Sequence, residues 1–168
     1  MPELHFQATI LSKLSLPQGK KGSGMIEGVK IRALVRHLDE RGYLMEILRD
    51  DDEEFVKFGQ VYLTTCNPGI VKAWHCHEKQ TDNLCLVKGA AKVGLWDGHR
   101  SQTVILSELE PKLLQVPPGI WHGFTALGGD PCYILNIPTE HYERENPDEL
   151  RKDPFDPEIE YQWEPQSR

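Results

Sequence analysis

The sequence predicts an all-β domain in which an antiparallel sheet is closed into a barrel or folded into a sandwich. Its 168 residues match the usual size of one domain. About ten short segments rich in β-forming residues follow one another, many of them roughly 8 to 12 residues apart, and hardly any stretch has helical periodicity. Turn signals separate these segments, for example Asn67-Pro68-Gly69 and Asp97-Gly98. Short strands at regular spacing are typical of closed or sandwiched antiparallel folds.

The expected elements run from an irregular lead-in at residues 1–24, through a barrel at 25–145, to a tail at 146–168 that wraps the surface. Gly28 interrupts the first strand, and a turn at residues 39–42 precedes the second. Short helical turns are expected only in flanking segments, at residues 50–54 and 147–151. The predicted strands cover residues 26–35, 43–47, 60–66, 70–77, 84–87, 90–96, 103–106, 113–116, 123–126 and 133–137.

Composition narrows the classes of function. The formal net charge is −7, from 19 Lys and Arg against 26 Asp and Glu, which argues against a nucleic-acid partner. The N-terminus does not have the order of a signal peptide, and no run of about 18 apolar residues occurs, so we expect no membrane association. The four cysteines form no C-x-x-C pair and are interpreted as reduced thiols of a cytoplasmic protein.

Three histidines and a carboxylate carry the strongest chemical signal. His75 and His77 are two residues apart on a predicted strand, so both side chains point to the same face. Asp82 follows on the next segment, and a Pro-Pro-Gly bend precedes His122. Two imidazoles and a carboxylate on neighbouring strands make a ligand set for a divalent metal ion such as Fe, Mn, Ni or Zn.

These segments resemble the two signature motifs of the cupin superfamily, which implies a double-stranded β-helix, or jelly-roll barrel. The first motif is Gly-x5-His-x-His-x3,4-Glu-x6-Gly, and residues 69–89 match it with Asp82 in place of Glu. The second motif is Pro-x-Gly-x-x-His-x3-Asn, which begins at Pro117 and reaches His122, with Ala126 in place of Asn.

Residues 26–163 also resemble a narrower family, the RmlC-like dTDP-4-dehydrorhamnose 3,5-epimerases and their relatives. Residues 39–46 resemble Asp-x-Arg-Gly-x-Phe-x-Glu, residues 69–75 resemble Gly-Val-Leu-Arg-Gly-Leu-His, and residues 120–124 resemble Ala-His-Gly-Phe. A closing Asp-Pro-x-Ile-x-Ile-x-Trp is matched by residues 153–163. The resemblance implies that His75 is the catalytic base and His122 a second pocket histidine. It further implies that the nucleotide diphosphate and base are held by Arg41, Glu46, Gln60 and Lys72.

Four features depart from the epimerase pattern. Asp82 stands where the family has an enolate-stabilising Lys, and Asn136 aligns best with the catalytic Tyr. The late Lys-Asp segment, whose Asp orients the base, has no counterpart before Arg168. His77 stands where the epimerases usually have Gln, and the resulting His-x-His resembles the related sugar 3,4-ketoisomerases.

Three hypotheses follow. In the first, the chain is a nucleotide-sugar epimerase or isomerase that needs no cofactor and acts on a 4-keto-6-deoxyhexose by proton transfer through an enol(ate). His75 is then the base, and its partners are drawn from His77, Tyr133 and Asn136. In the second, a metal-dependent cupin enzyme uses His75, His77, Asp82 and His122. The third is a non-catalytic sugar-binding cupin. The resemblance alone suggests a homodimer.

Overall fold

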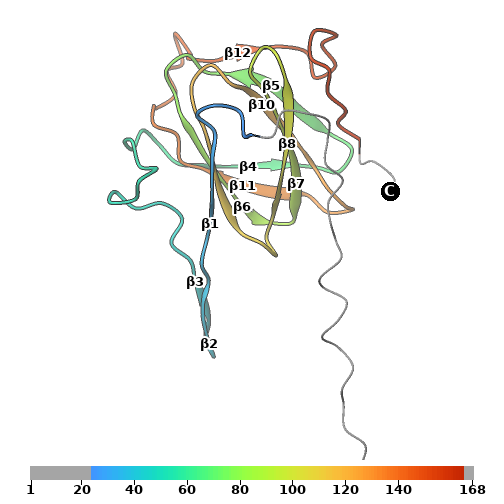
Figure 1. Ribbon diagram of the computed structural model, residues 1–168. Helices are drawn as coiled ribbons and strands as arrows, with labels where there is room; N and C mark the ends of the chain where they lie inside the picture. The colour runs from blue at the N-terminus through green and yellow to red at the C-terminus, as the bar shows by residue number, and fades with distance from the viewer. Residues whose placement is uncertain (1–23, 165–168) are drawn as a thin grey trace, which may run out of the picture.

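The computed structural model describes residues 24–164, which form two five-stranded antiparallel sheets and a separate two-stranded hairpin (Figure 1). The first sheet, in spatial order, contains β1 (Lys30–Ala33), β9 (Lys112–Val116), β6 (Asp82–Lys88), β11 (Cys132–Asn136) and β4 (Tyr62–Cys66). The second contains β12 (Leu150–Arg151), β5 (Val71–Cys76), β10 (Trp121–Ala126), β7 (Ala90–Trp96) and β8 (Ser101–Ser107). The hairpin joins β2 (His37–Asp39) to β3 (Gly42–Leu44).

From β4 to β12 the chain changes sheet at every step except the β7–β8 hairpin. This alternation is the winding of a double-stranded β-helix, so the predicted all-β jelly roll is confirmed. Apolar side chains fill the space between the sheets, among them Leu84 and Leu86 of β6 and Val93 and Leu95 of β7. Burying each such side chain stabilises the fold by about 1.5–3 kcal/mol.

The flanking segments differ from expectation, because residues 24–164 contain no helix. The charged stretch at residues 50–54 forms turns in which Asp52 N donates to Arg49 O and Phe55 N to Asp52 O. Its carboxylates are held by Arg32 of β1, which pairs with Asp52 and Glu54. The predicted helical turn at residues 147–151 is replaced by β12, which gains backbone partners on the edge of β5. The predicted lead-in, apart from Gly24, lies outside the described residues.

The β2–β3 hairpin projects away from both sheets (Figure 1). The sequence indicates its turn and β3, but β2 was not predicted. Among residues 24–164 its two strands pair only with each other, and Gly42 takes a positive φ of 131° at the turn. Leu38, Tyr43 and Leu44 are all exposed on it. A hairpin of this length gains little stability by itself, and its apolar side chains contribute nothing to the barrel core.

The segment after β12 returns over the second sheet. Ile159 and Trp163 are buried against Trp74 of β5. Gly94 of β7 leaves the room for this packing, because a Cβ there would lie 2.8 Å from both Trp74 and Trp163. The four cysteines, which were interpreted from the sequence as thiols, form no disulfide with one another, and all four are buried. In the described residues no helix is long and apolar enough to cross a membrane.

Candidate active site in the barrel interior

Three strands bring the histidine–carboxylate group together. His75 lies on β5 and His77 directly after its end, while Asp82 begins β6 and His122 lies near the start of β10. The predicted bend before β10 is anchored on β5, because Gly119 N donates to the carbonyl of His77 at 2.8 Å. Gly123 lets the two strands approach closely, since a Cβ there would lie 2.2 Å from that of Ala73.

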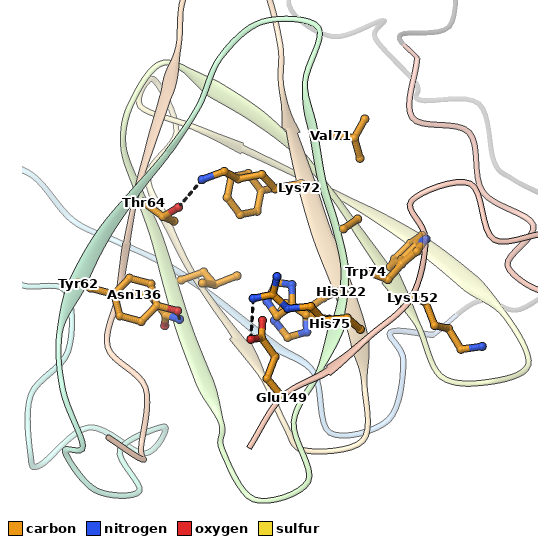
Figure 2. A pocket seen from close by; sticks show the side chains of 14 residues that line it. Tyr62, Thr64, Val71, Lys72, Trp74, His75, His122, Asn136, Glu149 and Lys152 are labelled. Carbon is orange, nitrogen blue, oxygen red and sulfur yellow. Dashed lines mark hydrogen bonds and ion pairs between the residues drawn. The ribbon is translucent and has the colours of Figure 1, made fainter. Parts of the chain in front are cut away.

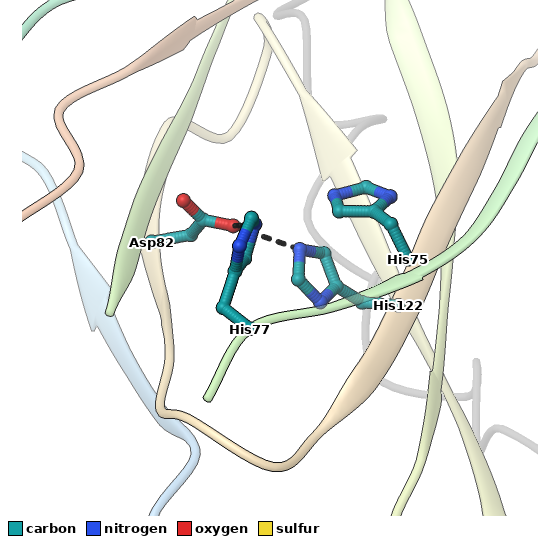
Figure 3. Close-up of side chains that lie close together, drawn as sticks. All are labelled: His75, His77, Asp82 and His122. Atoms are coloured by element: carbon teal, nitrogen blue, oxygen red, sulfur yellow. Dashed lines mark hydrogen bonds and ion pairs between the residues drawn. The ribbon is translucent and has the colours of Figure 1, made fainter. Parts of the chain in front are cut away.

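The side chains converge as the strand alternation predicts (Figure 3). The ring centroids of His75 and His122 are 4.0 Å apart, those of His75 and His77 5.7 Å, and those of His77 and His122 5.9 Å. The expectation that His75 and His77 share one face, and that the bend delivers His122 to them, is therefore confirmed.

Asp82 is the hub of this group and is almost fully buried. His122 Nε2 lies 2.8 Å and His77 Nε2 3.5 Å from its Oδ2. The amides of Gln80 and Asn136 both donate to its Oδ1 at 2.8 Å. Both carboxylate oxygens are thus engaged, so Asp82 holds the surrounding side chains in fixed orientations.

Of the three resolved pKa shifts in this group, those of Asp82 and His75 are downward and that of His77 is upward. Burial alone would raise the pKa of Asp82, but the bonds from His122 and His77 outweigh burial and hold it well below its usual range. For His77, burial would lower the pKa, yet the neighbouring Asp82 carboxylate raises it. Burial, together with the charge of His122, keeps the pKa of His75 well below its usual value. At neutral pH, His75 is therefore an uncharged imidazole able to accept a proton.

The same four side chains fit a divalent cation. One donor atom from each lies within 4.8 Å of all the others. Nδ1 of His122 contacts the carbonyl of Ile120 at 2.9 Å, and Nδ1 of His77 contacts that of Asp148. Backbone contacts of this kind orient metal-binding histidines with Nε2 inward. If Nδ1 of a neutral His122 carries the ring proton, its Nε2 atom has only a lone pair. That lone pair faces the negatively charged Asp82 carboxylate, so a second proton or a cation is needed between Nε2 and the carboxylate.

A cavity of about 470 Å³ opens over His75 and His122 (Figure 2). Lys72 lies at one end, where its Nζ donates to Thr64 Oγ1 at 3.1 Å. Tyr62 and Asn136 form the wall opposite the histidines. These two residues are direct partners across β4 and β11, and Asn136 Nδ2 donates to the Tyr62 hydroxyl at 2.8 Å.

A second cavity, of about 300 Å³, adjoins the first and shares Tyr62, His75 and Glu149 with it. It is lined by Gln60, His77 and Gln80, together with His141 and Tyr142 from the segment before β12. The structure thus brings seven of the predicted site residues to the two cavities or to the buried group beneath them: Gln60, Lys72, His75, His77, Asp82, His122 and Asn136.

Three predicted residues are not brought there. Tyr133 lines neither cavity, because side chains alternate along β11, and its ring packs under Lys88 instead. Arg41 is at the tip of the projecting hairpin, where it pairs with Asp39 and its side chain is 82% exposed. Glu46 follows β3 and pairs with Arg49 at 3.1 Å.

Sequence reasoning missed Tyr62, Glu149 and Arg151, which all line the main cavity. Tyr62 could have been found from the alternation of β4, because Thr64, two residues later, points to the same cavity. Glu149 and Arg151 gave no such signal, since the tail was expected to be irregular and only its pairing with β5 turns them inward.

Comparison with known proteins gives the family. Residues 37–150 match the polysaccharide biosynthesis C-terminal domain family. The chain is also 36% identical over 151 residues to the spore coat polysaccharide biosynthesis protein SpsL of Bacillus subtilis, covering 86% of this chain and all of SpsL. The chain belongs to this family. A further family relative is the probable low-salt glycan biosynthesis epimerase Agl13 of Haloferax volcanii, 35% identical over 135 residues, which are 75% of this chain and 86% of Agl13.

Solved structures agree with this assignment. The structure resembles a dTDP sugar isomerase from Desulfovibrio desulfuricans with a TM-score of 0.77 and 29% identity, over 82% of this chain and 92% of the isomerase. The resemblance to RmlC-like sugar-nucleotide epimerases and isomerases, inferred from the motifs, is therefore confirmed for this chain.

Proposed function

We propose that this chain is an isomerase acting on a 4-keto-6-deoxyhexose linked to a nucleoside diphosphate, by proton transfer through an enol(ate). The observation that carries the proposal is the state of His75. Its ring faces the cavity, its pKa is lowered by burial and by His122, and its imidazole makes no hydrogen bond with any residue in the described part of the chain. A buried neutral imidazole that faces a cavity is suited to remove a proton from a carbon beside a ketone.

A second group is needed to return the proton. Tyr62 lies on the wall opposite His75, and burial, reinforced by the Asp82 charge, raises its pKa to about 12 (Figure 2). Its oxygen accepts the bond from Asn136, which leaves the hydroxyl proton for the substrate. Asn136, whose amide is not an acid at neutral pH, therefore positions Tyr62. The Tyr62 hydroxyl supplies the proton. His77, which lines the neighbouring cavity, is the second candidate for this step.

The nucleotide part is assigned to the end of the cavity with Lys72, whose ammonium group suits a diphosphate. Gln60 lines the adjoining cavity and can donate to the nucleotide from there. We place this chemistry in the cytoplasm. The four free cysteines support that assignment, since thiols stay reduced in that compartment.

We also propose a homodimer in which the β2–β3 hairpin of one copy reaches the site of the other. Arg41 and Glu46 line neither cavity of their own chain. The hairpin carries Leu38 and Leu44, whose exposed fractions of 76% and 62% suit burial against a second copy. Sedimentation at increasing concentration tests this assignment, and a chain that stays monomeric throughout would contradict it.

Deuterium exchange tests the isomerase proposal. The protein is incubated in D2O with dTDP-, UDP- and GDP-linked 4-keto-6-deoxy sugars, and deuterium at the carbons beside the ketone is followed by NMR. At least one substrate is expected to exchange with the wild type and not with His75→Asn. Absence of exchange with every substrate, while a nucleotide sugar still binds, would favour the non-catalytic sugar-binding protein.

A metal-dependent enzyme is the second candidate, favoured by the His122 Nε2 and Asp82 carboxylate that face each other at 2.8 Å. His75, His77, Asp82 and His122 would hold the ion, which would supply Lewis-acid stabilisation of a developing oxyanion. Metal analysis of untagged protein separates the candidates. About one ion per chain, whose removal by a chelator abolishes exchange, would support the metal enzyme. Exchange that survives complete chelation would support the metal-free isomerase.

A further inference from the structure

The short strand β12 directs charged side chains into the proposed site. Arg151 is the direct partner of His75 across the antiparallel β12–β5 pair, and Leu150 is the partner of Cys76. Residues directly opposite each other in such a pair project to the same face. Arg151 and Glu149 accordingly line the cavity beside His75 and form an ion pair at 2.8 Å. Figure 2 shows Glu149 below His75.

Backbone contacts fix this strand on both sides of the pair. Before it, the Asp148 carboxylate accepts bonds from the backbone N–H groups of residues 78, 79 and 80 at 2.9–3.0 Å. After it, Lys152 and Trp74 exchange two backbone bonds at 3.0 Å. Residues 149–151 are held between these two anchors, so the position of their backbone relative to His75 is determined by the fold.

Three cations line the main cavity, and their partners differ. Lys72 donates to Thr64 at one end. Lys152 is held by Asp156 and Glu158 and lies 5.5–5.8 Å from the ring centroids of Trp121 and Trp96. Arg151 pairs with Glu149 through one nitrogen, and its side chain is 77% exposed. It is thus the cation best placed to contact a substrate that lies against His75.

The proposed reaction requires such a cation. When His75 removes a proton from the carbon beside the ketone, the C–H electron pair forms a C=C bond and the carbonyl oxygen becomes an enolate. The position at which the epimerases carry a Lys for this charge is Asp82 here, and a carboxylate cannot stabilise an anion.

We propose that Arg151, delivered by β12, binds and stabilises the enolate oxygen of the sugar, and that Glu149 orients its guanidinium group. The inference rests on the proposed isomerase function. On reprotonation from Tyr62 or His77 the C=C bond gives its electrons back to the C–H bond and the ketone is restored. Arg151 remains protonated throughout and exchanges no proton with the substrate.

The test compares Arg151→Gln and Arg151→Lys with the matched control Arg144→Gln, which changes an exposed arginine of the same segment that lines neither cavity. Substrate deuterium exchange, turnover and dTDP binding are measured for each. Arg151→Gln is expected to lower kcat about 10²–10³-fold, as loss of an oxyanion donor does, and to leave dTDP affinity unchanged. Arg151→Lys should recover part of the rate, and Arg144→Gln should behave as the wild type.

The outcomes separate the inference from the proposed function. Wild-type kinetics for Arg151→Gln, alongside loss of exchange in His75→Asn, would overturn the role of Arg151 and leave the isomerase intact. An equal loss in Arg151→Gln and Arg151→Lys, with weaker dTDP binding in both, would assign Arg151 to the nucleotide and also overturn the inference. No exchange by the wild type with any substrate would overturn the isomerase and the role of Arg151 together. Thermal melting of each variant excludes loss of the fold as the cause.

Discussion

The barrel interior and the β2–β3 hairpin both carry motif residues, but only the interior assembles them. Asp82 binds Gln80, His122 and Asn136 at 2.8 Å in a buried site. Arg41, on the hairpin, forms its ion pair with Asp39, two residues away, and is exposed to solvent. The motif residues inside the barrel find their partners within their own chain. The motif residues on the hairpin are proposed to act only in the site of a second copy.

Replacing the proposed base is expected to have the largest effect. His75→Asn removes the proton acceptor and keeps a polar side chain of similar shape, so kcat should fall about 10⁴-fold with little change in nucleotide binding. Deuterium exchange and dTDP titration measure the two quantities. His99→Asn, on an exposed turn, is the control. Retention of exchange in His75→Asn would contradict the assignment of the interior as the reactive region.

Removing the hub carboxylate tests whether the interior is held together as described. Asp82→Ala leaves the buried donors of His122, Asn136 and Gln80 without their acceptor, and should lower the free energy of unfolding by about 3–5 kcal/mol. Urea unfolding measures this change against Asp130→Ala on an exposed loop. A loss below about 1 kcal/mol, typical of a surface substitution, would mean that Asp82 does not organise the group.

Replacing Tyr62 separates the step that removes the substrate proton from the step that returns it. Tyr62→Phe keeps the ring and removes the hydroxyl, so turnover to product should fall about 10²-fold while deuterium still enters the substrate from the His75 side. NMR of the recovered sugar separates exchange with retention from exchange with inversion. If product forms at the wild-type rate, His77 becomes the proton donor.

The hairpin is expected to give the smallest effect. Arg41→Ala should raise KM about 10-fold through one lost charge-assisted contact, and change stability by less than about 0.5 kcal/mol because the side chain is exposed. Unfolding curves and initial rates measure both effects.

Mixing two impaired variants sharpens the comparison between the two regions. In a mixed dimer of Arg41→Ala and His75→Asn, one site has an intact base and an intact partner arginine, so subunit exchange should restore about a quarter of the wild-type sites. Rates are compared at a substrate concentration well below KM, where the higher KM of Arg41→Ala lowers its rate. Activity of the mixture equal to the mean of the separate variants would show that Arg41 does not act across copies.

Several site residues could be predicted from the sequence because their spacing is local. His75 and His77 share a face by the two-residue period of a strand, and the bend before His122 is set by Pro117, Pro118 and Gly119. Tyr133 was named, beside His77, as a possible partner of His75. The alternation of β11 directs it away from the cavity, and the hydroxyl that faces His75 comes from Tyr62 on the neighbouring strand.

By itself, the sequence determined most of the strands and the grouping of three histidines with Asp82, because alternation, turn residues and short motifs act over a few residues. The jelly-roll winding was implied by the resemblance to the cupin motifs. Only the tertiary structure decided that the tail adds β12 to β5 and turns Glu149 and Arg151 toward His75. Those positions depend on backbone pairing between segments about 75 residues apart, and a two-residue strand carries too little pattern for its partner or register to be read from the sequence.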